Sequence, residues 1–432
     1  MSDLNSFIQQ CSTAINTQNG EKLKLYLTLY PRNDVPSGLV QANFPEPSEF
    51  DLYQLGDKFR PVVRSHFKMM KAIYISKQIK TTFDEFNEMC NHLIRAAEVE
   101  TNWINVPLTA CLTELLAVYK VRQQSYPEEL GDYDQISGEE LISGNTKLTS
   151  IEKLANTLNK AFKISLNDKN VDLSLSKRCD IYFFMSQLMK LYYSMKKLDL
   201  AKSIEKAIKG TRFPMPNMKK SAKNRKYVVT YLYYSAKIAL DDGDFQQAQT
   251  KLDQAIEIIQ YLKNYQKSPQ YEKILFLAVP LKVYFGQLPK EKLWKYKSLS
   301  LVFKDLVTSI MTGNICKYQQ EIKKFEIVLL SNHLYLLMEK LKQYVYVNLI
   351  KQITKIVQSQ QDSSHIIPLS SYQIGFEYSR FNKSISWNEN HRYYEQNEIE
   401  CIIANLITMG KIKGYLSHGN RCLVLSKQNP FP

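Results

Sequence analysis

A run of basic residues near the middle of the chain is the clearest candidate for binding chemistry. Eight lysines and arginines fall between residues 206 and 226 of the 432-residue sequence, and no acidic residue interrupts them. Pro214 and Pro216 predict that part of this run is a loop. Uncompensated like charges repel one another, so the run favours an anionic partner over the simpler interpretation of a solvated surface. The candidate contacts to nucleic acid here are Arg212, Lys219, Lys220, Lys223, Arg225 and Lys226.

A second group of basic residues lies close to the C-terminus. Its candidate contacts are Lys411, Lys413, Arg421 and Lys427. Lys411 and Lys413 alternate with Ile412, which predicts that both lie on the exposed face of one strand. If both basic groups share one face of the protein, we expect contact with the backbone of RNA or DNA, because phosphates require only positive charge.

Residue sets that could catalyse a reaction are missing from the sequence. No two of the six histidines lie within five residues of each other, so the spacings of helical zinc sites are absent. The patterns of phosphate-binding loops and nucleophile elbows are absent as well. A histidine without a carboxylate or thiol neighbour has no general-base arrangement, so His418 is expected to have a turn or surface role. These observations predict a protein that is not an enzyme and has no metal or cofactor.

The C-terminal segment that carries the second basic group begins with a predicted helix and a short strand. Residues 365–369 predict a brief strand that Pro368 ends. The helix before it shows one apolar stripe at helical spacing. The stripe consists of Leu334, Leu337, Met338, Leu341, Val345, Leu349, Ile353 and Ile356.

A second helix and a hairpin complete this domain. The helix is predicted to begin at Asn397, with Glu400 in the capping-box position, and to end at Gly410. Two strand-like runs, 411–417 and 421–427, follow it around a tight turn. Helix, short strand, helix and hairpin is the order of a winged helix.

The second helix and the last strand indicate what the winged helix contacts. No lysine or arginine occurs between Tyr393 and Gly410, and three glutamates lie near the start of that helix. Glutamates there would repel a duplex, so sequence-specific reading of DNA is disfavoured. The last strand is apolar on both faces, and we predict that a helix of the chain or another winged helix covers the second face. The candidate partner contacts are Leu423, Val424 and Leu425.

The rest of the chain predicts a mainly α fold built from helical pairs. The content of 14 glycines and 15 prolines fits long helices better than a many-turned β fold. Residues 241–245 predict a sharp turn, and Ala248, Leu252 and Ala255 follow it at the spacing of tetratricopeptide-like repeats. The cluster Tyr227, Tyr231, Tyr233 and Tyr234 is predicted to pack within a helix in preference to stacking on bases.

Composition breaks suggest three regions. We expect N-terminal helices and a proline-rich linker over residues 1–47, helical repeats over 48–220, and a C-terminal domain over 221–432. The last region divides into a helical part, 221–332, and the winged helix, 333–432. Residues 126–145 are rich in Gly, Ser, Asp and Glu, which predicts a loop or insertion.

Charge and cysteine content bear on partners and location. A net charge of +15 serves solubility or an anionic partner. None of the seven cysteines forms a C-x-x-C pair, which indicates buried thiols in a reducing compartment. The first 21 residues contain no lysine or arginine, and the longest apolar run has eight residues. We therefore expect a protein of the nucleus and cytoplasm without membrane contact.

Six blocks of the sequence are similar to those of a known family. The blocks are Glu100–Ile104, Leu166–Asn170, Gly313–Asn314, Leu334–Leu341, Leu416–Cys422 and Leu425–Pro432. They resemble the PCI family, which is named from the proteasome lid, the COP-nine signalosome and translation initiation factor three. The last two blocks are similar to the branch of COP-nine signalosome subunit twelve, which includes the PCI subunit of a nuclear-pore mRNA-export complex. The resemblance implies helical repeats followed by a winged helix.

The resemblance implies two alternative functions. The first is a scaffold for transcription elongation, mRNA processing or mRNA export that binds nucleic acid. Its implied partners are another PCI protein of the mRNA-export type and a small acidic protein shared with the proteasome lid. The second is an architectural subunit of the COP-nine signalosome, in which another subunit removes the ubiquitin-like modifier Nedd from cullins. The basic run weakly favours the first function, because an architectural subunit needs no uncompensated charge.

Overall fold

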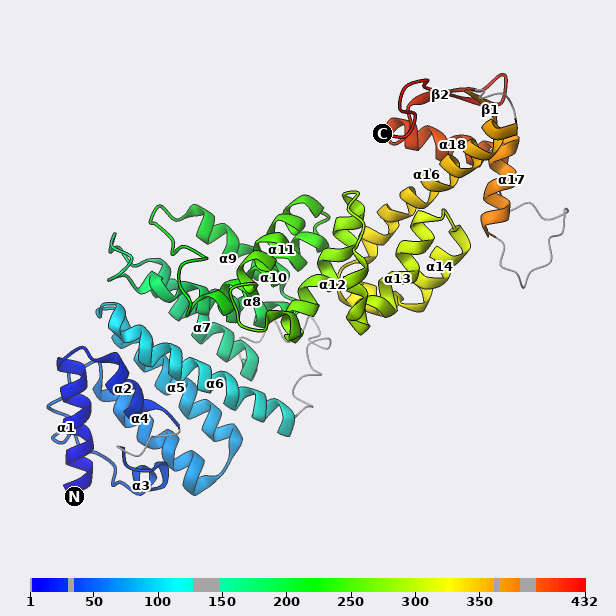
Figure 1. Ribbon diagram of the computed structural model, residues 1–432. Helices are drawn as coiled ribbons and strands as arrows, with labels where there is room; N and C mark the ends of the chain where they lie inside the picture. Colours follow the sequence, from blue (N-terminus) through cyan, green and yellow to red (C-terminus); the bar gives the residue numbers. More distant parts are fainter. Residues whose placement is uncertain (1, 30–34, 127–147, 361–364, 381–393) are drawn as a thin grey trace, which may run out of the picture. The chain divides into compact units, whose positions relative to one another are not determined.

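The computed structural model describes residues 2–29, 35–126, 148–360, 365–380 and 394–432. The chain forms two compact units, Met1–Tyr234 and Ser235–Pro432 (Figure 1). Helices make up most of both units, and the second unit also contains a small antiparallel sheet. The predicted fold class, helical repeats followed by a winged helix, is confirmed.

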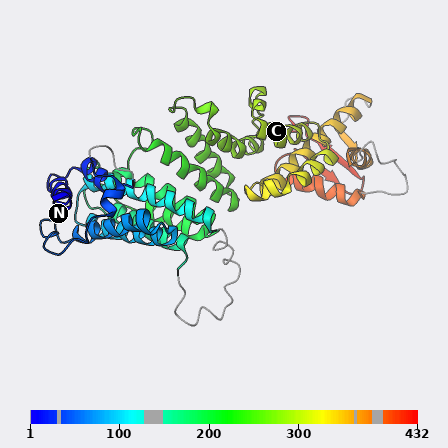
Figure 2. The same ribbon diagram turned by 90° about the horizontal axis from the view of Figure 1, so that it is seen from below.

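The first unit consists of helices that follow one another in short antiparallel steps. In both views α4, α5 and α6 lie side by side, and α7 packs against α5 and α8 (Figures 1 and 2). Its helices are α1 (Ser2–Asn16), α2 (Gly20–Leu27), α3 (Gly38–Ala42), α4 (Arg60–Lys71), α5 (Ile79–Ala97), α6 (Asn105–Ser125), α7 (Ser150–Leu166), α8 (Ile181–Ser194) and α9 (Leu198–Gly210). Helix α10 (Arg225–Asp241) begins in this unit and ends in the next.

The N-terminal residues share one apolar core with α4. Phe7 of α1 packs its ring against Phe44, which follows α3, and against Phe67 of α4. Val35 also belongs to this cluster. The stretch expected to be a proline-rich linker therefore contains a short helix and contributes side chains to the core.

One stretch of the first unit, Asn102–Ser125, has the length and apolar composition of a membrane-spanning helix, and it is the one such stretch within the described ranges. Half of its most apolar window is buried inside the protein. A core helix passes the same test by length and composition, and α6 packs between α2 and α5.

The second unit continues the helical pairs and ends in the sheet. Its helices are α11 (Phe245–Ile259), α12 (Pro269–Tyr284), α13 (Lys297–Met311), α14 (Ile315–Lys324), α15 (Glu326–Ser331), α16 (Tyr335–Gln360), α17 (Leu369–Arg380) and α18 (Gln396–Thr408). Its strands are β1 (Ile366–Pro368), β2 (Gly414–Ser417) and β3 (Cys422–Leu425).

Two of its helix-to-helix turns use the same two-residue device. Gly243 and Gly313 have φ values of +74° and +60°, which favour glycine, and each ends a helix. The next residue, Asp244 or Asn314, caps the following helix by accepting a hydrogen bond from a backbone N–H three residues on. The predicted turn at residues 241–245 is therefore confirmed, and a glycine followed by Asp or Asn explains how the pairs turn so sharply.

Helix α16 forms the central support of the winged helix. Seven of the eight residues in the predicted stripe are buried, and the exception is Ile356, which is 60% exposed. Helix α17 packs beside the last turns of α16, where Thr354 and Tyr372 share a hydrogen bond of 2.8 Å between their hydroxyls. Helix α17 itself was not predicted.

The sheet has the order β1-β3-β2, with β3 in the centre and both neighbours antiparallel to it. It lies next to the C-terminal end of α16 and beside α18 (Figure 1). The two predicted strands of the hairpin are present but shorter than expected. Strand β3 covers Cys422–Leu425, and β2 begins only at Gly414. Lys411 and Lys413 therefore precede the strand, and their predicted placement on its exposed face is wrong.

The start of α18 also differs from the prediction. The capping residue is Glu395, whose carboxylate accepts from the backbone N–H of Glu398 while the Glu398 carboxylate accepts from the backbone N–H of Glu395. Asn397 and Glu400 lie inside the helix instead, and both side chains contact Arg421. The helix cap therefore lies two residues earlier than predicted, and Asn397 and Glu400 make a tertiary contact in place of a cap.

Candidate nucleic-acid and partner interfaces

The basic run of the first unit lies on a loop that is tied to the start of α8. The Tyr182 hydroxyl donates to the carbonyl of Pro216 at 2.9 Å, and the Asn224 amide donates to the carbonyl of Cys179 at 2.6 Å. The guanidinium of buried Arg178 lies 4.7 Å from the ring centre of Phe213. The loop between α9 and α10 therefore has a defined position from which its cations project.

Most cations of this run are exposed, and several of them also have contacts within the protein. Arg212, Lys219, Lys220 and Lys226 are exposed. Lys223 forms an ion pair of 3.0 Å with Asp180, whose side chain is 8% exposed. Arg225 donates from Nε to the carbonyl of Lys219 at 3.0 Å.

The ion pair of Lys223 corrects the expectation that the whole run lacks compensation. Asp180 precedes Lys223 by more than forty positions in the sequence, so only the fold brings the carboxylate to the lysine. Lys223 and Arg225 therefore help to hold the loop in place, although the Lys223 side chain is still 58% exposed.

The C-terminal cations are divided in the same way. The Lys411 ammonium lies 3.7 Å from the ring centre of Tyr344 on α16, a cation–π contact that holds it against the domain. Arg421 forms an ion pair of 3.2 Å with Glu400 of α18. Lys413 and Lys427 are exposed. The two basic groups belong to different units, so the shared face remains a prediction.

Glu400 also changes the interpretation of His418. The Nδ1 atom of His418 lies 2.8 Å from a Glu400 oxygen, so the histidine does have a carboxylate neighbour, contrary to the expectation. The other Glu400 oxygen accepts from Arg421. The three side chains join the wing turn to α18, which is consistent with the turn role predicted for His418.

The outer face of the sheet carries an apolar row of three residues from three strands. Val424 of β3 pairs with Ile366 of β1 and with Tyr415 of β2. Ile366 is 53% exposed, Tyr415 is 63% exposed, and Val424 is half-buried. We call Ile366, Val424 and Tyr415 the outer row.

The other two predicted partner contacts face the inside of the domain. Leu423 is fully buried and Leu425 is 3% exposed. Because side chains alternate along a strand, these two residues share the inward face and Val424 faces outward. In this structure Leu423 and Leu425 belong to the core of the winged helix.

No group of three or more His, Cys, Asp and Glu residues that could hold a metal ion occurs among the residues that the structure describes. Burial raises the pKa of Cys11 and Cys111 far above the usual range of a thiol, and it raises the pKa of Cys179 to about 12. These thiols are therefore protonated near neutral pH and are weak nucleophiles. His391 lies outside the described residues.

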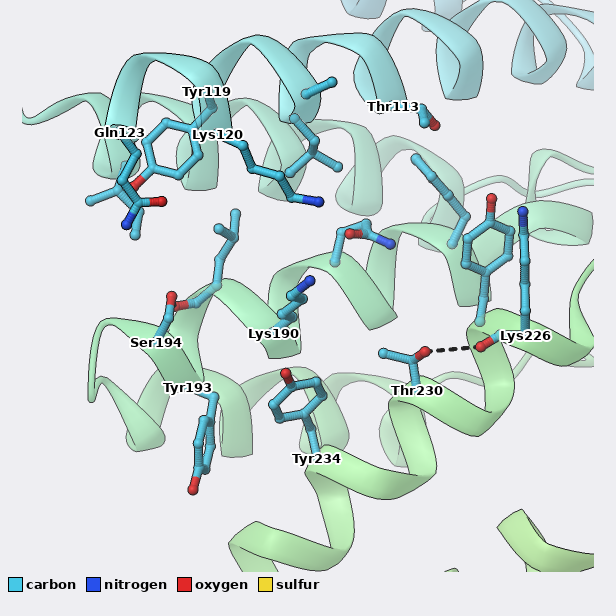
Figure 3. A pocket seen from close by; sticks show the side chains of 17 residues that line it. Thr113, Tyr119, Lys120, Gln123, Lys190, Tyr193, Ser194, Lys226, Thr230 and Tyr234 are labelled. Carbon is cyan, nitrogen blue, oxygen red and sulfur yellow. Dashed lines mark hydrogen bonds between the residues drawn. The ribbon is translucent and has the colours of Figure 1, made fainter. Parts of the chain in front are cut away.

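A groove in the first unit brings together basic residues that the sequence did not single out. It has a volume of about 630 Å³ and lies among α6, α7, α8 and α10 (Figure 3). Lys120 of α6, Lys190 of α8 and Lys226 of α10 line it. Only Lys226 belongs to the basic run, because the other two are single lysines on helices seventy residues apart.

Two of the blocks that resemble the PCI family meet in the first unit. Lys177 donates from Nζ to the carbonyl of Glu100 at 2.9 Å, and its backbone N–H donates to the Asp168 carboxylate at 2.7 Å. Asn102 donates to the carbonyl of Ser174. These contacts close a junction between the end of α5 and the segment that leads into α8, which is a structural role.

Comparison with known proteins identifies the C-terminal domain and full-length relatives. Residues 317–427, from α14 to β3, match the family model of the PCI domain. "Protein CSN12 homolog" of Debaryomyces hansenii is 45% identical over 99% of this chain and 98% of its own length. "Cop9 signalosome complex subunit 12" of Saccharomyces cerevisiae is 27% identical over 88% and 87%. "PCI domain-containing protein 2" of Danio rerio is 25% identical over 99% and 97%.

Proposed function

Because the chain belongs to the PCI-domain family of CSN12 homologues, we propose that it is a non-catalytic scaffold subunit that joins another PCI protein in a signalosome-type assembly. The similarity to a CSN12 homologue over nearly the whole length of both chains carries this proposal. The name of the Saccharomyces cerevisiae relative supports the signalosome-type assembly over the mRNA-export role.

We propose the outer row as the contact with the PCI partner. Ile366 and Tyr415 expose more than half of their apolar side chains on either side of Val424. A flat apolar face of this kind is unfavourable in water and gains stability when a partner covers it. Lys413 is exposed two residues before Tyr415 and Lys427 three residues after Val424, and charged residues near an apolar centre are usual at the rim of interfaces.

Introducing a charge into the outer row is expected to separate the two proteins. Tyr415→Asp and Val424→Asp should each weaken binding of the PCI partner by at least about tenfold, because a carboxylate would be buried in an apolar interface without a counter-charge. The measurement is affinity purification of the tagged full chain from cells, with mass spectrometry of the PCI-domain proteins that it retains.

Val171→Asp is the matched control, because Val171 is 70% exposed and lies in the other unit. It should retain the same proteins as the natural sequence. Tyr415 is well exposed, so its substitution leaves the fold intact even if Val424→Asp impairs folding. If the folded Tyr415→Asp protein still retains its PCI partner at the natural level, the outer row is not the interface.

We further propose that the exposed cations of the basic run bind nucleic acid backbone, as would serve mRNA processing or export. The observation that favours this second function is that Arg212, Lys219 and Lys220 project from an anchored loop. Lys219 and Lys220 leave the same short turn, since the backbone N–H groups of both donate to the side chain of Asn217. Adjacent exposed cations are suited to successive phosphates.

Reversing these three charges is expected to reduce the salt dependence of DNA binding. Arg212→Glu, Lys219→Glu and Lys220→Glu together should remove about 2.7 from the logarithmic salt slope on a 20-base-pair duplex. Lys223 and Arg225 stay unchanged because they anchor the loop. Fluorescence anisotropy at several salt concentrations measures the slope. An unchanged slope would remove the loop from the nucleic-acid interface, and binding of a polyglutamate peptide in place of DNA would assign it to an acidic protein.

A further inference from the structure

The lining of the groove in the first unit carries positive charge and no negative charge. Its seventeen lining residues include three lysines and no aspartate or glutamate. The lysines come from three different helices, and all three are exposed. Figure 3 shows the amino groups of Lys120 and Lys190 pointing into the space between α6 and α8. The lining therefore concentrates positive charge in a concave site, where the field on a ligand is stronger than on a convex surface.

The α10 side of the groove supplies aromatic rings that are held in fixed positions. The ring of Tyr227 packs edge-on against Phe183, with ring centres 5.1 Å apart. Tyr234 packs against Tyr193 at 5.3 Å. Both Tyr227 and Tyr234 also line the groove, so these tyrosines can contact a ligand in addition to packing within the protein.

Polar side chains without charge complete the lining. Gln123 and Gln187 bring amide groups, and Thr113 and Thr230 bring hydroxyl groups. Amides can donate to and accept from the edges of bases. Lysines that meet phosphates, rings that meet base faces and amides that meet base edges together form the chemistry of a nucleic-acid site.

We propose that this groove binds a short segment of single-stranded nucleic acid. A single strand can place its phosphates on the lysines and its bases on the tyrosines, whereas the bases of a duplex are already stacked and paired. Lys226 connects the groove to the basic run, because it is the last residue of the run and also lines the groove. A strand can therefore continue from the groove toward the exposed cations of the loop.

This site goes beyond the scaffold role, and it is separate from the outer row and from the three loop cations tested above. Lys120, Lys190 and Tyr234 take part in neither of those proposals. A failure of partner binding through the outer row would leave the groove unaffected, and a failure of the groove would leave the scaffold role and the loop unaffected.

The test measures binding of a fluorescein-labelled 15-nucleotide poly-uridine strand to the full chain by anisotropy. Lys120→Glu with Lys190→Glu should reduce the logarithmic salt slope by about 1.4, since each lost phosphate contact on a single strand accounts for about 0.7. Tyr234→Ala should weaken binding by about tenfold without changing the slope, because it removes a stacking surface and no charge. Lys120→Gln with Lys190→Gln gives a second, milder variant should the reversal impair folding.

The matched control is Lys58→Glu with Lys163→Glu, which changes the net charge equally at exposed lysines outside the groove. It should bind the strand as the natural sequence does. Equal losses in the control and the groove variant would overturn the proposal. So would a 15-base-pair duplex that binds as tightly as the strand, or Tyr234→Ala with natural affinity. Competition by polyglutamate at the same charge concentration as the strand would also overturn it, because it would indicate an acidic protein as the occupant.

Discussion

Replacing Gly313 with alanine is expected to lower the free energy of unfolding of the unit Ser235–Pro432 by about 3 kcal/mol. Gly313 has a φ of +60°, a conformation that costs an L-residue about 1 kcal/mol. A β-carbon there would also lie 2.6 Å from the backbone nitrogen of Leu349 and 2.7 Å from its Cα atom. Helix α16 would have to move away, and overpacking of this kind costs about 2 kcal/mol.

The site around Gly313 leaves little room for such a movement. The carbonyl of Gly313 accepts from the Ser379 hydroxyl of α17 at 2.7 Å, and Ser379 in turn accepts from the backbone N–H of Ile315 at 2.9 Å. The Asn348 amide of α16 donates to the carbonyl of Ile310 at 2.8 Å. Helices α13, α14, α16 and α17 are thus joined at this turn, so a shift of one strains the others.

Gly286→Ala is the matched control for this prediction. Gly286 lies in the same unit and has a φ of +80°, but a β-carbon there would meet no atom within 4 Å. Urea unfolding of the two variants should therefore differ by about 2 kcal/mol, the part that comes from overpacking. Equal stability of the two would show that α16 adapts to the extra carbon at no cost.

The same turn illustrates how far the sequence predicts this fold. A glycine followed by Asp or Asn marks the turns at Gly243 and Gly313, because only local backbone preferences are involved. The stripe of α16 and the strands of the wing are also readable, since burial on one face imposes a period on the sequence. Helix α17 was missed because its buried face includes the polar residues Gln373, Glu377 and Ser379, which interrupt the apolar period.

The candidate sites were predicted less completely, because tertiary contacts decide which charges are available. A run of cations can be read from the sequence, but the pairing of Lys223 with Asp180 and of Arg421 with Glu400 cannot. The groove shows the opposite case, in which the fold brings together cations that the sequence did not single out. Lys120 and Lys190 are isolated in the sequence, and packing of α6 against α7 and of α7 against α8 places them around one groove.

Unfolding of the first unit is expected to depend on pH through one buried histidine. His66 of α4 is fully buried and stacks on the ring of Phe7 at 6.0 Å. Its Nε2 atom lies 2.7 Å from the side-chain oxygen of Gln41. The side-chain NH₂ group of Gln41 donates to the backbone carbonyl of Pro36, which fixes the orientation of the amide. Because the Gln41 oxygen can only accept, the proton of the neutral imidazole is assigned to Nε2. Its Nδ1 atom is buried without a hydrogen-bond partner among the described residues.

Burial lowers the pKa of His66 from 6.5 to about 3, because a proton on Nδ1 would place an uncompensated charge in an apolar core. The unfolded chain therefore binds this proton more readily than the folded protein between those two values. The contribution of His66 to stability is complete above pH 6.5 and is lost as the pH falls toward 3. The greatest slope is about 1.4 kcal/mol per pH unit, so the loss between pH 7 and pH 5 is about 2 kcal/mol.

His66→Gln tests this prediction, because glutamine keeps a donor for Gln41 and does not titrate. Urea unfolding at pH 7, 6 and 5 should show that the natural protein loses about 2 kcal/mol more than the variant over this range. Carboxylates titrate in both proteins, so their contribution cancels in the difference between the two free energies of unfolding. Parallel curves for the two proteins would mean that the folded protein takes up the proton as easily as the unfolded chain. The core of α1, α3 and α4 would then have to open or hydrate near neutral pH, which contradicts the tight ring packing of Phe7 against Phe44 and Phe67.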